Sequence, residues 1–276
     1  MSTWLITGCS TGLGRALAQA VLARGDTVVA TARDPASIQD LADAHPNTAL
    51  ALALDVTDAT QITAAVNAAQ ERFGALDVLV NNAGYGYRAA VEEAEDNDVQ
   101  TLFATNFFGP VALIKAVLPD MRARRRGTIV NVSSIAARRS PAGSGYYAAT
   151  KAALEALTAS LRKEVEPLGI AAMIVEPGAF RTDFSGRSLT QSRRAIDDYA
   201  DTAGRRRKEN DTSDGTQPGD PARAAQAIIA AVESPDPPLM LVLGPDALST
   251  FRESLDTLST DLNAWEHLST DTSFDT

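Results

Sequence analysis

Near its N-terminus the chain reads Thr3-Trp4-Leu5-Ile6-Thr7-Gly8-Cys9-Ser10-Thr11-Gly12-Leu13-Gly14, and this stretch decides the fold class. The apolar run at residues 3–7 predicts a short buried strand. Apolar residues then recur at helical spacing as far as Gly25, which predicts a helix that ends there. Glycines let a backbone come close to a pyrophosphate, and a helix N-terminus offers free N–H groups. The stretch is therefore typical of a phosphate-binding turn, with a plain tight turn as the alternative.

The alternation of strand and helix continues along the chain. Apolar runs at residues 27–32, 50–54, 77–80, 128–132, 170–175 and 239–242 predict six further strands, and helical patterns lie between them. That order favours an α/β fold, with one open, mostly parallel sheet and helices on both of its faces. We expect this single domain to span residues 1–245, followed by a helical extension and tail at residues 246–276.

Bulk composition argues against several classes of function. The net charge of −10 over 276 residues disfavours nucleic acid and anionic membranes as partners. Because Cys9 is the single cysteine, an internal disulfide framework is excluded. Cys9 together with the two histidines, His45 and His267, cannot make a usual zinc site, so we expect no metal site. Because apolar runs stay shorter than about 18 residues, we expect no spanning helix. These features predict a soluble, cytoplasmic protein.

Small and polar residues follow the predicted strands, at the edge of the sheet where ligands bind in this architecture. Arg33 follows the second strand, where the ribose of a dinucleotide would lie. An arginine there suits a 2′-phosphate, whereas an acidic residue suits a 2′-hydroxyl. Arg15 is a second candidate cation, and both arginines could instead be solvated. The other candidates at strand ends are Asp55, residues 81–84, Ser134, Pro177 and Gly178, with Ser10 and Thr11 as hydroxyl donors.

Tyr147 and Lys151 form a candidate acid/base pair. They are four residues apart in a segment rich in helix formers, so they share one helix face. A free tyrosine titrates near ~10, and lowering its pKa by ~3 units needs roughly 4 kcal/mol. A unit charge at ~4 Å in an effective dielectric of ~20 supplies about that much. The pair is therefore suited to proton transfer at neutral pH, although a surface lysine beside a core tyrosine has the same spacing.

Asn106 lies on the apolar stripe of a helix predicted at residues 98–121. A buried amide must be satisfied, because leaving it unpaired costs about 1–3 kcal/mol. Its side chain therefore either bonds a neighbouring backbone group or holds a water inside the site.

Two later segments have no place in the strand–helix alternation. Residues 183–219 are polar and rich in arginine, which predicts a mobile lid over the binding site or a disordered stretch. In the tail, apolar residues recur from Leu248 to Trp265 at alternating steps of three and four. We expect that helical stripe to pack on the body or on a partner subunit, since it is too short for an independent coiled coil.

Taken in order, these residues resemble the short-chain dehydrogenase/reductase family over residues 3–182, with a looser fit to Val242. The family's T-G-x-x-x-G-x-G pattern occurs at residues 7–14, its N-N-A-G at residues 81–84 and its P-G-x-x-x-T at residues 177–182. Tyr147 and Lys151 match the Y-x-x-x-K pair, and Ser134 precedes Tyr147 by thirteen residues. Tyr146 does not match, because Thr150 follows it by four.

The resemblance implies a Rossmann-type doubly wound fold with about seven strands. It also implies an oxidoreductase that interconverts an alcohol and a ketone or aldehyde by hydride transfer, as an alcohol dehydrogenase or carbonyl reductase. NADP(H) is the preferred cofactor, because Arg33 follows Ala32, with NAD(H) as the alternative. A homodimer or homotetramer is expected through the helices that carry Asn106 and Tyr147. The implied catalytic residues are Asn106, Ser134, Tyr147 and Lys151. The implied cofactor-binding residues are Gly8, Ser10, Thr11, Gly12, Leu13, Gly14, Arg33, Asp55, Val56, Asn82, Ala83, Gly84, Tyr147, Lys151, Pro177, Gly178 and Thr182.

Two other classes of function share this fold and remain open at the level of sequence. One is a nucleotide-sensing regulator, because fold alone does not fix function. The other is a lyase, epimerase or dehydratase that retains its cofactor. The substrate, beyond a small alcohol or carbonyl compound, lies outside what the resemblance implies.

Overall fold

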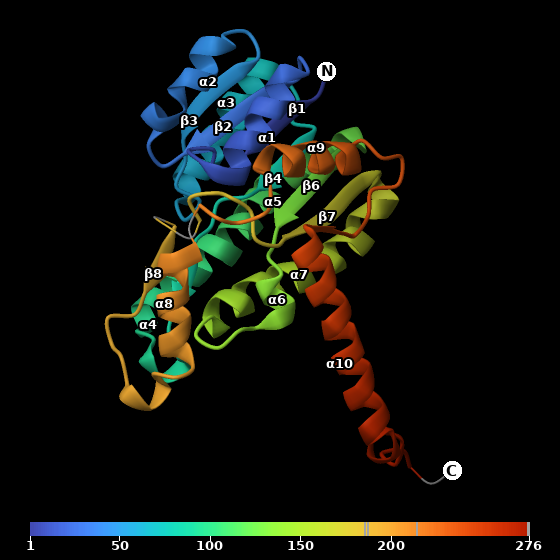
Figure 1. The fold of residues 1–276 in the computed structure, drawn as a ribbon. Coiled ribbons are helices and arrows are strands. Elements are labelled where there is room, and N and C mark those ends of the chain that lie inside the picture. The colour runs from blue at the N-terminus through green and yellow to red at the C-terminus, as the bar shows by residue number, and fades with distance from the viewer. Residues whose placement is uncertain (185, 187, 214, 275–276) are drawn as a thin grey trace.

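A seven-stranded parallel sheet forms the centre of the molecule (Figure 1). The structure is a computed structural model that describes residues 1–184, 186, 188–213 and 215–274. The strand order is β3-β2-β1-β4-β6-β7-β9. The strands are β1 (Thr3–Ile6), β2 (Thr27–Ala32), β3 (Ala49–Ala53), β4 (Val78–Asn81), β6 (Gly127–Val132), β7 (Ile170–Pro177) and β9 (Met240–Leu243). The predicted α/β fold with a doubly wound sheet of about seven strands is confirmed.

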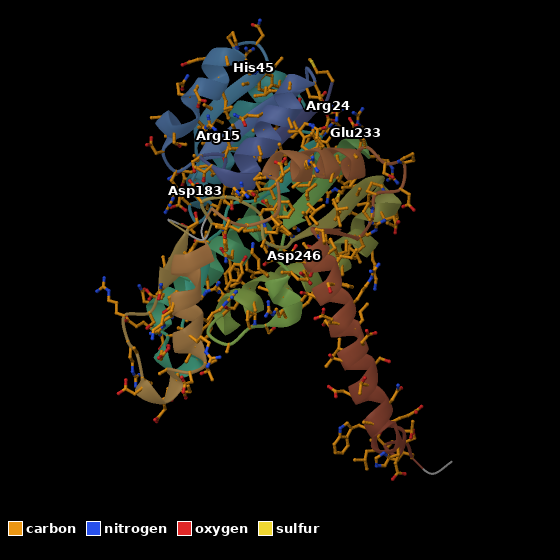
Figure 2. The ribbon with its side chains drawn as sticks, in the orientation of Figure 1. Arg15, Arg24, His45, Asp183, Glu233 and Asp246 are labelled. Atoms are coloured by element: carbon orange, nitrogen blue, oxygen red, sulfur yellow. The ribbon has the colours of Figure 1, made fainter. Side chains whose placement is uncertain are left out.

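Helices cover both faces of the sheet because each strand is apolar on both sides. Apolar residues of α1 (Gly12–Ala23), α2 (Gln39–Ala44) and α9 (Pro221–Val232) build the core on one face. Those of α3 (Ala59–Phe73), α5 (Gly109–Arg124) and α7 (Gly145–Val165) build it on the other. Figure 2 shows the ends of α1 and α9 close together, where Arg24 forms an ion pair with Glu233.

The strand order reverses direction at β1, which has β2 on one side and β4 on the other. The chain therefore passes to opposite faces of the sheet after β1 and after β4, and a crevice opens at the carboxyl ends of these strands. The glycine loop after β1 and residues 82–84 after β4 border that crevice.

The helix predicted at residues 98–121 is longer and is interrupted. It comprises α4 (Asp96–Phe103), a π-helical turn (Ala104–Phe108) and α5. By length and composition this run, Asp96–Arg124, could cross a membrane. Leu113, Val117 and Met121 of α5 are instead buried against the sheet, so the run is a core helix of the fold.

The segment between β7 and α9 forms a small unit beside the sheet. It contains β8 (Leu189–Gln191), a 3-10 turn (Asp197–Tyr199) and α8 (Ala203–Ser213). β8 pairs in parallel with β5 (Gly86–Arg88), and this second sheet was absent from the sequence prediction. Residues 185, 187 and 214 of the predicted lid lie outside the described residues. We call the segment from Phe180 to Gly219 the lid, since a β-bridge joins those two residues and closes its ends.

The last helix, α10 (Pro245–Thr270), extends away from the body (Figure 1). Its first turn is packed, with Ala247 fully buried, and it contacts the short helix α6 (Ala136–Arg139). Farther along, the apolar residues predicted to pack on the body or on a partner are exposed in the single chain. Short 3-10 turns at Pro35–Ile38, Val91–Glu93 and Glu166–Leu168 complete the element order.

Candidate active site

A cavity of about 1180 Å³ lies at the carboxyl ends of the strands. Pockets for a single small ligand usually measure about 300–1,000 Å³, so this one has room for a dinucleotide together with a substrate. Arg15 and Asn81, which were also candidates, lie outside the lining, and of the catalytic and cofactor-binding residues that the resemblance implies all but Gly14 and Asn106 line it. Those two lie immediately behind the lining, where they contact Asn82 and Gly84 respectively.

The glycine loop lies directly on the residues that follow β4. Gly8 has φ +71°, and a Cβ there would lie 2.9 Å from Ala83 Cα. A Cβ on Gly14 would lie 2.3 Å from Asn82 Nδ2. Asn82 Nδ2 donates hydrogen bonds to the carbonyls of Thr7 (2.8 Å) and Gly8 (3.1 Å). Larger side chains would therefore push the two loops apart and change the shape of the cavity.

Thr7 contributes a side-chain bridge that we did not predict. Its hydroxyl accepts hydrogen bonds from the backbone N–H groups of Asn82 (3.0 Å) and Ala83 (2.9 Å). The sequence signal was present, because Thr7 belongs to the T-G pattern at the end of β1.

The first turn of α1 suits a phosphate group. Ser10, Thr11, Gly12 and Leu13 all line the cavity. The first N–H groups of a helix have no intrahelical acceptor, and its dipole favours an anion. The loop therefore fits the pyrophosphate of a dinucleotide.

The two candidate cations differ in position. Arg33 is exposed at the end of β2 and lines the cavity. Arg15 instead donates to the carbonyl of Ser37 (3.2 Å) and forms an ion pair with Asp40. Arg15 is therefore occupied on the surface, and Arg33 is the candidate for a 2′-phosphate. After β3, Asp55 accepts hydrogen bonds from the backbone and hydroxyl of Thr57 at 2.9 and 2.7 Å.

α7 brings Tyr147 and Lys151 into the cavity beside Ser134. Both side chains are largely buried, at 5% exposure each. Ser134 lies close enough to Tyr147 for its side chain to act on the pKa of the Tyr147 hydroxyl, and both line the cavity. Lys151 Nζ donates to the Val132 carbonyl (2.8 Å) and lies 5.9 Å from the centre of the Tyr147 ring.

The electrostatics of the pair differ from the sequence expectation. Burial raises the pKa of Tyr147 above its ordinary value, while the nearby Ser134 side chain and the charge of Arg88 act to lower it. Burial also lowers the pKa of Lys151 to about 8, against the opposing effect of Glu155. The prediction that Lys151 lowers the Tyr147 pKa does not describe this structure, because the desolvation of a buried phenol outweighs the nearby charges.

Asn106 occupies the π-helical turn and bonds to backbone. Its Oδ1 accepts from Tyr85 N (3.1 Å), and its Nδ2 donates to Tyr85 O (2.9 Å) and Thr150 Oγ1 (3.3 Å). Of the two alternatives, the structure shows the first, in which the amide bonds a neighbouring backbone group. A Cβ on Gly84 would lie 3.0 Å from Asn106 Oδ1 and 3.5 Å from Lys151 Nζ. Asn106 thus fixes the backbone next to the lysine.

The loop after β7 is held by α10. Asp246 Oδ2 accepts the backbone N–H of Ala179 (2.7 Å), and a Cβ on Gly178 would lie 2.4 Å from the same oxygen. Asp246 also lines the cavity, at the root of α10 in Figure 2. We did not predict it, although it follows the last strand and the strand-end rule applies to it.

A buried layer of charge lies beside Ser134. Ser133 donates to Glu155 (2.5 Å), and Arg138 pairs with both Glu155 and Glu176, the latter at 3.0 Å. Burial, and next the neighbouring Glu155, raise the pKa of Glu176 to about 8 in spite of Arg138. The two carboxyl groups and one guanidinium therefore hold the segment that carries Ser134.

Polar side chains fasten the lid to the body. Glu93 is 2% exposed and accepts hydrogen bonds from the N–H groups of Ala90 (2.8 Å) and Ile196 (2.9 Å). It also forms an ion pair with Arg207 of α8. Ser192 donates to the Glu93 carbonyl at 2.6 Å. The lid thus borders the Tyr147 end of the cavity, where the Phe184 ring lies 5.7 Å from the Tyr147 ring.

Comparison with known proteins identifies the family. The family model for short chain dehydrogenases matches residues 2–193. Oxidoreductase BOA17 of Botryotinia fuckeliana is 37% identical over 267 residues, which cover 96% of this chain and 97% of that protein. The 3-ketodihydrosphingosine reductase of Bacteroides thetaiotaomicron is 36% identical, over 91% of this chain and 90% of its own length.

Solved structures agree with this assignment. A short-chain dehydrogenase from Streptomyces avermitilis superposes with a TM-score of 0.92 at 44% identity, covering 99% of this chain and 98% of that one. A serine dehydrogenase in complex with NADP+ has a TM-score of 0.75 at 25% identity, over 88% and 94% of the two chains. The chain belongs to the short-chain dehydrogenase/reductase family and is an oxidoreductase, as the resemblance predicted.

Proposed function

We propose that the protein interconverts an alcohol and a ketone or aldehyde with NADP(H), with Tyr147 as the general acid and base. One observation carries the proposal. The Ser134 and Tyr147 side chains lie next to each other in the same cavity that begins at the glycine loop. A substrate oxygen placed against that pair can accept one hydrogen bond and exchange one proton.

The roles of the residues follow from their positions. A bound nicotinamide supplies or accepts the hydride. Ser134 hydrogen-bonds the substrate oxygen, and Tyr147 donates a proton to it in reduction or removes one in oxidation. Lys151 stabilises negative charge at the phenol oxygen once that charge develops, and it binds the ribose of the cofactor. Asn106 fixes the backbone beside Lys151 through its bonds to Tyr85.

The residues that line the crevice opposite Ser134 and Tyr147 hold the cofactor. Residues 10–13 bind the pyrophosphate, and Arg33 binds the 2′-phosphate of NADP(H). Neighbours were solved with NAD or with NADP, which supports a nicotinamide cofactor, and Arg33 is the residue on which the choice of NADP(H) rests. Asp55 and Val56 flank the adenine, while residues 82–84, Pro177, Gly178 and Thr182 enclose the nicotinamide half.

The proposal also covers the extent of the catalytic domain, its location and its assembly. The catalytic domain comprises residues 1–245 and acts in the cytoplasm on a small alcohol or carbonyl compound. Two copies pair through α4, α5 and α7 into a homodimer, or two such dimers form a homotetramer. Sedimentation of the protein as a monomer at micromolar concentration would contradict this assembly.

A turnover screen tests the function. Purified protein is mixed with NADPH and a panel of ketones and aldehydes, and loss of NADPH absorbance is followed with the stoichiometric alcohol product. Tyr147→Phe should lower turnover at least about 100-fold while NADPH still binds. Tyr146→Phe is the matched control, since its hydroxyl bonds the Val91 carbonyl instead, and its turnover should be unchanged.

Three results would contradict the proposal. Near-wild-type turnover in Tyr147→Phe would remove the proposed acid. NADPH binding with no turnover across the panel would favour a nucleotide-sensing regulator. Product formation without net NADPH consumption would favour a lyase, epimerase or dehydratase.

A further inference from the structure

The exposed half of α10 carries an apolar stripe with coiled-coil spacing. The stripe consists of Leu248, Phe251, Leu255, Leu258, Leu262 and Trp265, separated alternately by three and four residues. This is the a/d spacing of a heptad repeat. Leu255, Leu258, Leu262 and Trp265 are 53%, 57%, 70% and 58% exposed. A helix that projects from the body with such a stripe needs a second surface to bury it (Figure 1).

The charges of α10 restrict what that surface is. Its polar positions carry Asp246, Glu253, Asp256, Asp261 and Glu266 against one arginine, Arg252, and one histidine, His267. Helices that lie on membranes have basic polar faces, which attract anionic lipids. An acidic helix is repelled by them. A heptad stripe is instead complementary to another heptad stripe, because each knob fits a hole of the same repeat.

We propose that α10 pairs antiparallel with α10 of a second copy of this chain. The pairing is twofold symmetric, so each stripe covers the other with the same residues. Leu258 packs opposite the partner's Leu262, and Leu255 opposite the partner's Trp265. In this register the paired part of the stripe runs from Leu255 to Trp265, about one and a half heptads, but each helix is already ordered at its packed root, so less chain entropy is lost on pairing.

The residues beside the stripe select the orientation. In the antiparallel register Arg252 of each helix faces the partner's Glu266, which gives two opposite-charge pairs. The same register places Asp261 next to the partner's Asp261 at the twofold axis, a single like-charge contact. In a parallel pair Asp261 of each helix would lie beside the partner's Glu266, which gives two like-charge contacts.

The root of α10 connects this interface to the active site. Arg138, which pairs with Glu155 and Glu176, lies over the ring of Phe251 at 5.3 Å. Asp246 in the first turn binds the loop after β7. Pairing of the distal turns therefore fixes the direction of a helix whose other end borders the cavity.

Sedimentation velocity of the full chain at micromolar concentration tests the pairing. Leu258→Glu inserts a charge into the stripe. It should halve the mass of the assembly relative to wild type where α10 pairs copies that the bodies do not join, and it should raise the dissociation constant of the dimer at least about tenfold where the bodies join the same two copies. Thr260→Glu adds the same charge on the opposite side of the helix and should leave the mass unchanged. Circular dichroism checks that both variants keep their helices. Equal masses together with equal dissociation constants for wild type and Leu258→Glu would overturn the proposal.

Charge exchange tests the orientation. Glu266→Arg would face Arg252 in the antiparallel pair and should weaken association by about threefold or more, and adding Arg252→Glu should restore it. Tighter association of Glu266→Arg alone would show a parallel pair and overturn this orientation. Wild-type protein that floats with phosphatidylglycerol vesicles, while its mass matches that of Leu258→Glu, would show that a membrane covers the stripe instead.

Discussion

The floor and the lid of the cavity are held by different forces. The floor comprises the glycine loop, residues 82–84, Ser134, Tyr147 and Lys151, and it is fixed by sheet hydrogen bonds and by buried contacts such as Asn82 to Thr7 and Gly8. Among the described residues of the lid there is one short strand pair, and charged side chains around Glu93 hold another part of it. Apolar burial makes the floor rigid, whereas the polar contacts described for the lid can open locally.

This difference separates two tasks. Proton transfer requires atoms placed within a fraction of an ångström, and the floor supplies that placement. Selection of a substrate depends on the side chains that contact it. Loops on a rigid scaffold can vary these side chains from one family member to another. We therefore expect floor variants to lower turnover and lid variants to weaken substrate binding.

The largest expected effect comes from removing the charge of the floor. Lys151→Met keeps the length and burial of the side chain but removes the ammonium that would stabilise a Tyr147 phenolate. Turnover should fall by at least about 100-fold, with circular dichroism unchanged. Lys163→Met, on the exposed end of the same helix, is the control. Equal turnover in the two variants would mean that Lys151 serves only packing.

A smaller effect is expected from releasing the lid. Glu93→Gln removes the ion pair with Arg207 and should raise KM about tenfold while kcat changes less than about threefold, since breaking a buried pair costs up to about 3–5 kcal/mol locally. Glu95→Gln, an exposed neighbour, should behave as wild type. A fall in kcat with KM unchanged would place Glu93 in the floor instead.

The third prediction concerns cofactor selection at the edge of the floor. Arg33→Asp removes a cation suited to a 2′-phosphate and adds an acceptor for a 2′-hydroxyl, so the ratio of kcat/KM for NADPH to that for NADH should fall by about tenfold or more. Arg15→Asp is the matched control, because Arg15 pairs with Asp40 outside the cavity. If the two substitutions shift this ratio equally, the net charge of the protein, and not the position of Arg33, determines the cofactor preference.

The smallest expected effect is a change in the pH dependence of stability. The pKa of Glu176 is raised to about 8, chiefly by burial, so the folded state retains a proton that the unfolded state releases near ~4.5. Folding stability should therefore fall as the pH rises from about 4.5 to about 8. Glu176→Gln removes that titration, and its melting temperature should depend less on pH over this range. If the melting temperatures of wild type and Glu176→Gln change equally with pH, another group controls the pH dependence of stability.

The floor could be predicted from the sequence because its determinants are local. Strands and helices follow from apolar periodicity, and the parallel order brings Ser134, Tyr147 and the glycine loop to one edge. The pairing of Gly86 with Leu189 and the contact of Glu93 with Arg207 join residues about 100 positions apart, and no local pattern encodes them. The direction of the Tyr147 pKa was also missed, because spacing gives the distance to a charge but not the depth of burial.

The β-bridge between Phe180 and Gly219 has a consequence for engineering. Because the insert between them leaves and rejoins the scaffold at adjacent points, a graft of different length or composition need not shift β7 or α9. Chimeras that exchange this insert between relatives should therefore inherit new substrate preferences while retaining the parental chemistry.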